Sequence, residues 1–154
     1  MILKNARILI IDDDTDVLTA VRLLLRPHVR DIVAEKNPDL LPGLLRQQAF
    51  DLILLDMNFK SALNTGNEGL YWLRKIKELK PEVAVVMITA YGDIDLAIRS
   101  LKEGAADFVV KPWHNEKLIA TIKEAIKRKE HKGAAPPPVS SIFETELLGE
   151  SEVM

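Results

Sequence analysis

The stretch Arg7-Ile8-Leu9-Ile10-Ile11-Asp12-Asp13, near the start of this 154-residue chain, decides how the protein is expected to fold. Its first five residues form an isoleucine-rich run that stops at two aspartates, as a strand buried on both faces of a parallel sheet does. Residues 17–25 then carry apolar side chains at helical spacing, and Asp14 or Thr15 can cap that helix. A strand followed by a helix is the repeating unit of an α/β fold.

The same alternation of a short apolar run and a helical pattern continues along the chain. Further strands are predicted at residues 31–35, 51–55, 83–88 and 108–110, and further helices at 38–48, 70–79, 94–101 and 118–126. The run at 31–35 is polar at both ends and is therefore placed at an edge of the sheet. Pro42 and Gly43 weaken the helix predicted at 38–48. Five strand–helix units predict a parallel sheet with helices on both faces.

The composition is that of a globular protein. Lys and Arg number 21 against 23 Asp and Glu, so the formal charge is −2, and 47% of the residues are hydrophobic. The absence of cysteine excludes disulfides, thiolate nucleophiles and cysteine-ligated zinc. The apolar runs are far shorter than the ~20 residues that span a bilayer, and no signal peptide is evident. We therefore expect a soluble, cytoplasmic domain with no membrane contact, and the near-neutral charge gives no reason to expect nucleic-acid binding by it.

The composition changes after Lys132. Gly133 opens a segment that contains three successive prolines, Pro136 to Pro138, and such a run favours an extended, semi-rigid spacer. We therefore expect a globular domain over residues 1–132 and a proline-rich linker over 133–146.

Residues that can carry chemistry stand where the predicted strands end. Asp12 and Asp13 follow the first strand, Asp56 the third, Thr89 the fourth and Lys111 the fifth. Because ligands of parallel sheets bind beyond the carboxyl ends of the strands, these side chains are expected at one rim. Three clustered carboxylates repel one another, and Mg²⁺, which takes oxygen ligands, relieves that repulsion. With Lys111 and Thr89 to contact an anion, the pattern predicts magnesium-assisted phosphoryl chemistry on a carboxylate.

Each of these residues also has an ordinary structural interpretation. An aspartate at a strand end is commonly a cap or turn residue, and Asp14 and Asp16 are interpreted in that way. The functional interpretation depends on suitable residue types ending four strands at once. The histidines show no metal-ligand spacing, and the tryptophans, Trp72 and Trp113, are interpreted as packing residues or part of a contact face.

Five short segments carry a resemblance to a known family. They are Ile10-Ile11-Asp12-Asp13-Asp14, Leu54-Leu55-Asp56, Ile88-Thr89-Ala90-Tyr91-Gly92, Gly104-Ala105-Ala106-Asp107-Phe108 and Val110-Lys111-Pro112-Trp113. In this order and spacing they resemble the receiver domain of bacterial response regulators, over about residues 5–130. The resemblance implies an α/β, flavodoxin-like, doubly wound sheet of five parallel strands in the order 2-1-3-4-5, with five helices.

The resemblance also implies roles for the residues at the predicted rim. Asp56 corresponds to the phosphoacceptor, which takes a phosphoryl group from a sensor histidine kinase. Asp12 and Asp13 correspond to the acidic pair that orients Mg²⁺, and Asn58 to the residue whose backbone carbonyl binds the metal. Lys111 corresponds to a contact of the phosphoryl oxygens. A domain of this kind is not an ordinary enzyme, because it catalyses only its own phosphorylation and dephosphorylation.

Further roles concern the switch and the lifetime of the phosphoryl group. Thr89 corresponds to the second phosphoryl contact, and Phe108 resembles the aromatic switch residue that follows its movement. Asn58 and Tyr91 stand at the positions on which phosphoryl lifetime depends, and a ring of Tyr91 over the site would restrict the attacking water. The loop at 57–68 is longer than in most receivers and lacks their proline, which leaves a tolerated insertion and a functional lid as alternatives.

Two segments indicate a subfamily. Residues 87–93 resemble nitrogen-regulator-type activators of sigma-54 polymerase, and residues 147–154 resemble the start of the sigma-54-activating ATPase module. The resemblance implies a homodimer through the fourth helix, fifth strand and fifth helix. No nucleotide-binding G-x-x-x-x-G-K-[ST] loop is present, so contact with DNA and polymerase is expected only through domains outside this chain.

Two alternative functions stay open at this point. One is a stand-alone receiver that acts only by binding a partner. The other is a haloacid-dehalogenase-like phosphatase, because Asp12-Asp13-Asp14-Thr15 also fits a D-x-D-x pattern with Asp12 as the nucleophile. Labelling of Asp56 rather than Asp12 by a phosphoryl donor would separate the switch from the phosphatase.

Overall fold

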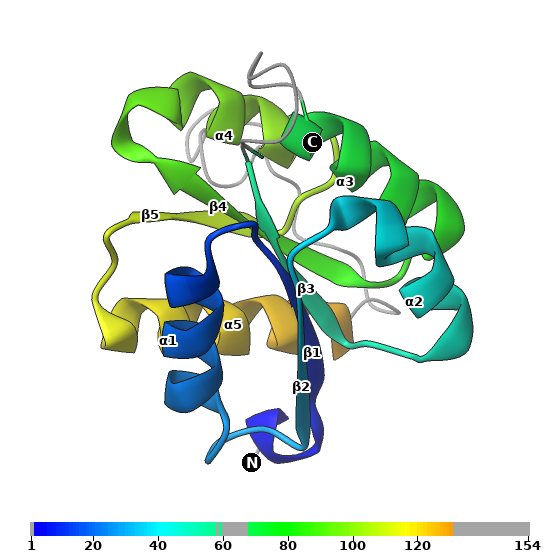
Figure 1. Ribbon diagram of the computed structural model, residues 1–154, viewed down its shortest axis with the longest axis vertical. Coiled ribbons are helices and arrows are strands. Elements are labelled where there is room, and N and C mark those ends of the chain that lie inside the picture. The colour runs from blue at the N-terminus through cyan, green and yellow to red at the C-terminus, as the bar shows by residue number, and fades with distance from the viewer. Residues whose placement is uncertain (1, 58, 60–67, 131–154) are drawn as a thin grey trace, which may run out of the picture.

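The protein was analysed as a computed structural model, which describes residues 2–57, 59 and 68–130 (Figure 1). The predicted linker at 133–146, the segment 147–154, Asn58 and most of the long loop lie outside the described residues. Among the helices of the described ranges, none has the length and apolar character needed to cross a bilayer.

A five-stranded parallel sheet forms the centre of the molecule. Its strands are β1 (Arg7–Ile11), β2 (Asp31–Glu35), β3 (Leu52–Asp56), β4 (Ala84–Ala90) and β5 (Asp107–Lys111). Their spatial order is β2-β1-β3-β4-β5, and every neighbouring pair is parallel. This confirms the predicted strand order and the edge position of residues 31–35.

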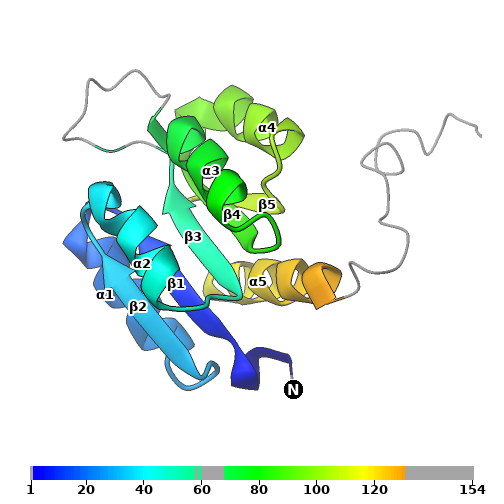
Figure 2. The ribbon, with the colours of Figure 1, turned by 90° about the vertical axis from the view of Figure 1, so that its right-hand side faces the viewer.

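Five α-helices cover the two faces of the sheet. They are α1 (Thr15–Leu25), α2 (Leu41–Gln47), α3 (Glu68–Leu79), α4 (Ile94–Lys102) and α5 (Asn115–Glu130). Helices α1 and α5 pack on one face, and α2, α3 and α4 on the other (Figures 1 and 2).

The strands are apolar throughout because each has a core on both sides. In β1, Ile8 and Ile10 point into the core beneath α1 and α5, whereas Leu9 and Ile11 point into the core beneath α2 and α3. All four side chains are fully buried. Alternate residues of a strand face opposite sides, so a continuous apolar run is what a sheet covered on both faces requires.

Two local features differ from the predictions. The helix predicted at 38–48 is divided into a 3₁₀ turn, Pro38–Leu40, and α2, which begins at Leu41. Pro42 therefore lies in the first turn of α2, where a residue without an N–H is tolerated. A short 3₁₀ helix at Ile2–Asn5, which was not predicted, buries Leu3 completely.

Candidate functional site

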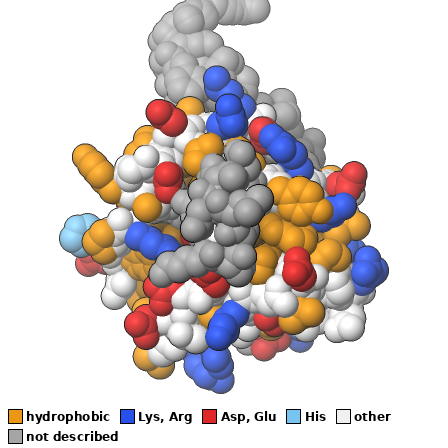
Figure 3. All heavy atoms as spheres, turned by 45° about the horizontal axis from the view of Figure 1, so that its top comes forward, with side chains coloured by type: hydrophobic (Ala, Val, Ile, Leu, Met, Phe, Trp, Pro, Cys, Tyr) orange, Lys and Arg blue, Asp and Glu red, His pale blue; other side chains and the backbone are white. Residues whose placement is uncertain are grey.

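The carboxyl end of the sheet brings together the residues that were singled out at the strand ends. Asp12 follows β1, Asp56 is the last residue of β3, Thr89 lies near the end of β4 and Lys111 ends β5. The strand register sets their relative heights, since Asp56 pairs with Ile88 and Lys111 with Ala90. In Figure 3, where this end of the sheet comes forward, acidic side chains are visible near the middle of the face.

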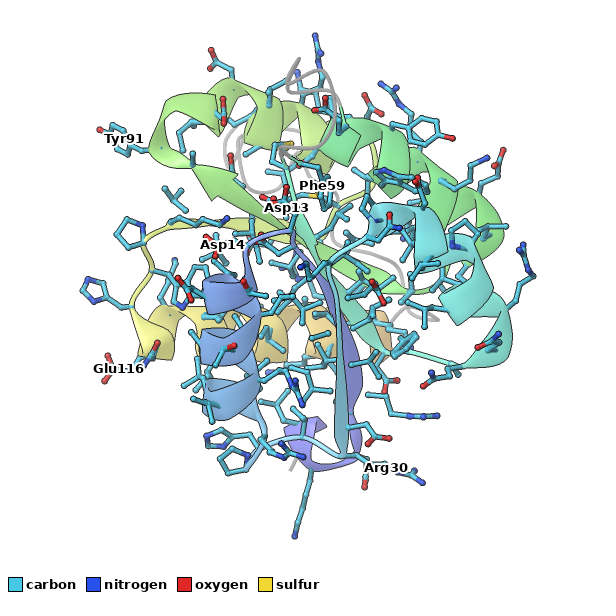
Figure 4. All side chains as sticks on the ribbon, viewed as in Figure 1. Asp13, Asp14, Arg30, Phe59, Tyr91 and Glu116 are labelled. Carbon is cyan, nitrogen blue, oxygen red and sulfur yellow. The ribbon has the colours of Figure 1, made fainter. Side chains whose placement is uncertain are left out.

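Three carboxylates form a tight cluster at this rim. Oxygen atoms of Asp12, Asp13 and Asp56 all lie within 4.8 Å of one another. Asp12 is fully buried, Asp56 is only 4% exposed, and Asp13 is half-buried (Figure 4). Three like charges at this separation, two of them removed from water, repel one another strongly and are stabilised by a nearby cation.

Lys111 offsets part of this negative charge. Its Nζ lies 3.1 Å from Asp12 Oδ2 and 3.6 Å from Asp56 Oδ1, so one ammonium group bridges two carboxylates. Burial acts to lower the pKa of Lys111, but attraction to Asp56 and Asp12 outweighs it and raises the pKa above its ordinary value. Lys111 therefore stays protonated and holds a positive charge beside the Asp56 carboxylate.

The buried carboxylate of Asp12 is held by local backbone as well as by Lys111. The Asp14 N–H donates to Asp12 Oδ1 over 2.9 Å, and Asp14 in turn accepts from the Asp16 N–H and caps α1. Burial raises the pKa of Asp12, and the hydrogen bond from Asp14 and the charge of Lys111 only partly offset this effect. Asp14 is the helix cap that was predicted, and its backbone N–H also holds the Asp12 carboxylate, a local contact that is common for an aspartate and the residue two positions later.

The donor set fits a divalent cation. Asp12 Oδ2 is buried, and its partner among the described residues is the Lys111 ammonium, 3.1 Å away. Mg²⁺ prefers hard oxygen ligands and is held by one or two carboxylates together with water and phosphate oxygens. The cluster of Asp12, Asp13 and Asp56 therefore supplies the ligand chemistry that was expected for magnesium.

Thr89 and Phe108 lie on the two strands beyond the carboxylate cluster. Thr89 is 1% exposed, and its hydroxyl donates to the carbonyl oxygens of Ala90 and Asp93 over 3.3 and 3.4 Å. Phe108 is partly buried and packs against the core beneath α2, α3 and α4. The Thr89 hydroxyl is thus directed toward the connection that leads into α4.

Tyr91 is one of the two residues that are expected to affect the lifetime of the phosphoryl group. Tyr91 is 83% exposed and points into solvent, away from Asp13 (Figure 4). Its ring therefore does not cover the carboxylate cluster in this structure, and Tyr91 is the first residue of the short 3₁₀ turn Tyr91–Asp93. Asn58 lies outside the described residues.

Gly69 is a site-supporting residue that sequence analysis did not single out. The Gly69 N–H donates to the Met57 carbonyl over 2.9 Å, and a Cβ at position 69 would lie 2.6 Å from that oxygen and 3.0 Å from the Asp56 carbonyl. Backbone that close to the residue after Asp56 leaves room only for glycine. The first turn of α3 thus packs directly against the backbone of Asp56 and Met57.

Comparison with known proteins agrees with this geometry. The sequence model of the response regulator receiver domain matches residues 8–123. The chain belongs to this family. Because the chain belongs to the receiver family, the haloacid-dehalogenase-like phosphatase is no longer an alternative. The predicted fold is the one found in solved structures of receiver domains.

Curated relatives of this receiver are longer proteins. It is 30% identical to the transcriptional regulatory protein ZraR of Escherichia coli K12, over 97% of this chain and 33% of ZraR. It is 31% identical to the response regulator protein PilR of Pseudomonas aeruginosa, over 99% of this chain and 32% of PilR. The chain therefore spans about a third of the length of these relatives.

Solved structures show the same arrangement. The receiver is 48% identical to the N-terminal signal receiver domain of a Bacteroides fragilis response regulator, covering 80% of this chain and 98% of that one, with a TM-score of 0.73. NtrX from Brucella abortus, in complex with ADP, is 28% identical over 96% of this chain and 31% of its own, with a TM-score of 0.77.

Proposed function

We propose that this receiver is a cytoplasmic phosphorylation switch in which Asp56 accepts a phosphoryl group from a sensor histidine kinase, with Mg²⁺ bound at the same site. The observation that carries the proposal is the cluster of Asp12, Asp13 and Asp56 within 4.8 Å, with Lys111 Nζ 3.6 Å from Asp56 Oδ1. An acceptor carboxylate, metal-binding carboxylates and a fixed cation are the parts that phosphoryl transfer to an aspartate needs.

The chemistry is a displacement at phosphorus. A carboxylate oxygen of Asp56 forms a bond to phosphorus while the bond from phosphorus to the kinase histidine nitrogen breaks, and the departing imidazole keeps that electron pair. Lys111 remains protonated and offsets the negative charge of the phosphoryl oxygens. Asp12, Asp13 and Asp56, with the backbone carbonyl of Asn58, would hold Mg²⁺, which when bound supplies further charge neutralisation.

Phosphorylation would then change the contacts of Thr89. Its hydroxyl makes only long hydrogen bonds, of 3.3 and 3.4 Å, to the backbone that precedes α4. Phosphoryl oxygens on Asp56 offer a stronger, charged acceptor and favour an inward position of Thr89, which Phe108 follows. The surface formed by α4, β5 and α5 is the proposed homodimer face.

The output of the switch is proposed to be transcriptional. The name of one relative includes the words transcriptional regulatory protein, and the chain corresponds to only a third of it. We assign residues 1–132 to the receiver, 133–146 to a linker and 147–154 to the start of a sigma-54-activating ATPase module. Binding of DNA and sigma-54 polymerase would then belong to the domains that follow.

The test is phosphorylation by acetyl phosphate, followed by intact-protein mass spectrometry with and without Mg²⁺. We expect one phosphoryl adduct that requires Mg²⁺ and is abolished in Asp56→Asn. Asp95→Asn, which changes an exposed carboxylate at the same end of the sheet, is the matched control and should label normally. An adduct that survives in Asp56→Asn, or that forms equally without Mg²⁺, contradicts the proposal.

A further inference from the structure

Helix α4 has no large side chain that is fully buried. Among its nine residues only Ala97 and Ser100 are buried, and both side chains are small. Ile98 is 43% exposed. Leu96 and Leu101 are partly buried and pack against the core beneath α2, α3 and α4. Hydrophobic stabilisation is roughly proportional to the apolar area removed from water, so a helix without a fully buried large side chain is held less firmly than one that has several. The position of the helix therefore depends strongly on contacts at its two ends.

The N-terminal end of α4 is in contact with the phosphoacceptor rim. Thr89 Oγ1 lies 3.4 Å from the carbonyl oxygen of Asp93, the residue immediately before the helix. Thr89 and Asp56 stand on adjacent strands, because Asp56 pairs with Ile88. A change at Asp56 that moves Thr89 thus acts directly on the start of α4.

The C-terminal end of α4 is tied to α3 by a bidentate ion pair. Arg74 Nε donates to Glu103 Oε1 over 2.5 Å, and Arg74 Nη2 donates to Glu103 Oε2 over 2.9 Å. Glu103 is the C-cap of α4 and directly follows its last residue, Lys102. The hydrogen bonds from Arg74 lower the pKa of Glu103, so the pair is fully ionised near neutral pH. Parallel hydrogen bonds of this kind define orientation as well as distance.

Lys77, one turn further along α3, lies between the backbone that precedes β4 and the backbone that follows α4. Its Nζ donates to the Val83 carbonyl over 3.0 Å. Its aliphatic carbons lie 3.4–3.8 Å from the place where a Cβ of Gly104 would stand, and Gly104 has a φ of +112°. The chain can leave α4 at this point because glycine tolerates that angle. Arg74 and Lys77 together make α3 a fixed support for the end of α4.

We propose that the Arg74–Glu103 pair holds α4 in its unphosphorylated position and thereby sets how readily a change at Asp56 is transmitted to the α4 surface. The inference rests on the proposed function, since it names a regulator of the same site. Helix α4 has one end on the rim and the other on α3, so the pair opposes any displacement that begins at Thr89.

The solvent exposure of the pair determines how large an effect its removal should have on the position of α4. The Arg74 side chain is 60% exposed and that of Glu103 25%, so solvent screens their attraction. Exposed ion pairs are weak, and removing one changes an equilibrium constant by no more than roughly fivefold. Loss of the pair should therefore raise the ratio of displaced to undisplaced α4 by a factor within that limit.

The test uses Glu103→Gln and Arg74→Lys, which keep similar side-chain volume but remove the bidentate geometry. NMR spectra of the ¹⁵N-labelled chain are recorded with Mg²⁺ and increasing beryllofluoride, a phosphoryl mimic. Glu78→Gln is the matched control, because it removes the 3.7 Å Lys75–Glu78 pair within α3 and leaves the α3–α4 connection intact. Amide exchange of α4 is measured in the unliganded proteins.

We expect α4 resonances of both test variants to lie closer to their beryllofluoride-bound positions before any ligand is added, with faster α4 amide exchange. Glu78→Gln should behave as the original protein. The double variant should shift no further than either single variant, because both remove one interaction. Shifts and exchange equal to those of Glu78→Gln would overturn the inference.

Failure of the proposed function gives a different result. In that case beryllofluoride leaves the amide resonances next to Asp56 unchanged in the original protein, whatever happens at α4. Amide exchange in the unliganded Glu103→Gln protein still decides whether the pair restrains α4. Exchange of α4 amides equal to that of the original protein would reject this restraint.

Discussion

Helices α4 and α5 lie on opposite sides of strands β4 and β5 but are held in very different ways (Figure 2). The sixteen residues of α5 bury Leu118, Ile122 and Ile126, and the helix contacts three strands and the N-terminal 3₁₀ turn. The nine residues of α4 bury only Ala97 and Ser100. The long helix is anchored by several fully buried large side chains, whereas the short one packs through the partly buried Leu96 and Leu101 and through polar contacts at its ends.

This difference indicates which part of the predicted α4–β5–α5 surface can move. A ligand shifts a conformational equilibrium only by its differential interaction with the two states, so a switch works best on an element with a small restoring energy. Helix α4 satisfies that condition and begins next to Thr89, while α5 provides a fixed reference. We therefore expect the larger displacement at α4.

The largest effect should come from matched truncations in the two helices. Ile122→Ala in α5 removes a fully buried side chain and is expected to lower the free energy of unfolding by about 2–5 kcal/mol. Ile98→Ala in α4 trims a side chain that is 43% exposed and should cost less than about 1 kcal/mol. Urea denaturation followed by circular dichroism measures both. Equal losses would show that the two helices are anchored alike.

Amide exchange of the original protein should show the same contrast without any substitution. Local opening requires less free energy where few apolar contacts are broken. Central amides of α4 should exchange at least about tenfold faster than those of α5, a ratio that corresponds to about 1.4 kcal/mol. Hydrogen–deuterium exchange by NMR at neutral pH gives the rates. Equal protection in the two helices would remove the physical basis for a movable α4.

The hydroxyl of Thr89 allows a more specific test of how the site reaches α4. Thr89→Val keeps the shape of the side chain but removes the donor to the Asp93 carbonyl. We expect a several-fold weaker response of α4 resonances to beryllofluoride, because one hydrogen bond contributes about 1 kcal/mol. Thr89→Ser, which keeps the hydroxyl, is the control and should retain most of the response. An undiminished response in Thr89→Val would mean that another contact carries the signal.

The elements of the fold were predictable wherever one short segment determines them. The apolar run 7–11 became β1 without a change of boundary, and the polar ends of 31–35 correctly placed β2 at the edge. The prediction of one helix at 38–48 was less accurate, because a proline that breaks the interior of a helix is accepted in its first turn. Sequence pattern alone does not say which turn Pro42 occupies.

The candidate site was predictable for a geometric reason. Carboxyl ends of parallel strands meet at one edge, so residues that end different strands had to approach one another. The direction of each side chain was not predictable, as the exposed Tyr91 ring shows. Nor could spacing reveal the Arg74–Glu103 pair, whose members are 29 residues apart and meet only because α3 and α4 share one face of the sheet.

The smallest effect should be the pH dependence contributed by that pair. Hydrogen bonds from Arg74 lower the pKa of Glu103 in the folded protein below its ordinary value. The folded state therefore binds this proton less readily than the unfolded state, and the stabilisation is fully present above the ordinary pKa of glutamate, about 4.3. It is lost as the pH falls through the lower, folded pKa. The stability difference between the original protein and Glu103→Gln should accordingly shrink over that acidic range and stay constant above it.

Comparison of the two proteins isolates this titration, because the remaining carboxylates are common to both. Urea denaturation at a series of pH values gives the difference, and amide exchange shows whether it is confined to α4. The α5 amides should follow global unfolding alone, since α5 packs on the opposite face of the sheet from α3 and α4, which carry the pair. A difference that is independent of pH would show that Glu103 contributes through packing and not through its charge. In that event α4 would be held by shape, and its release would not depend on an ion pair.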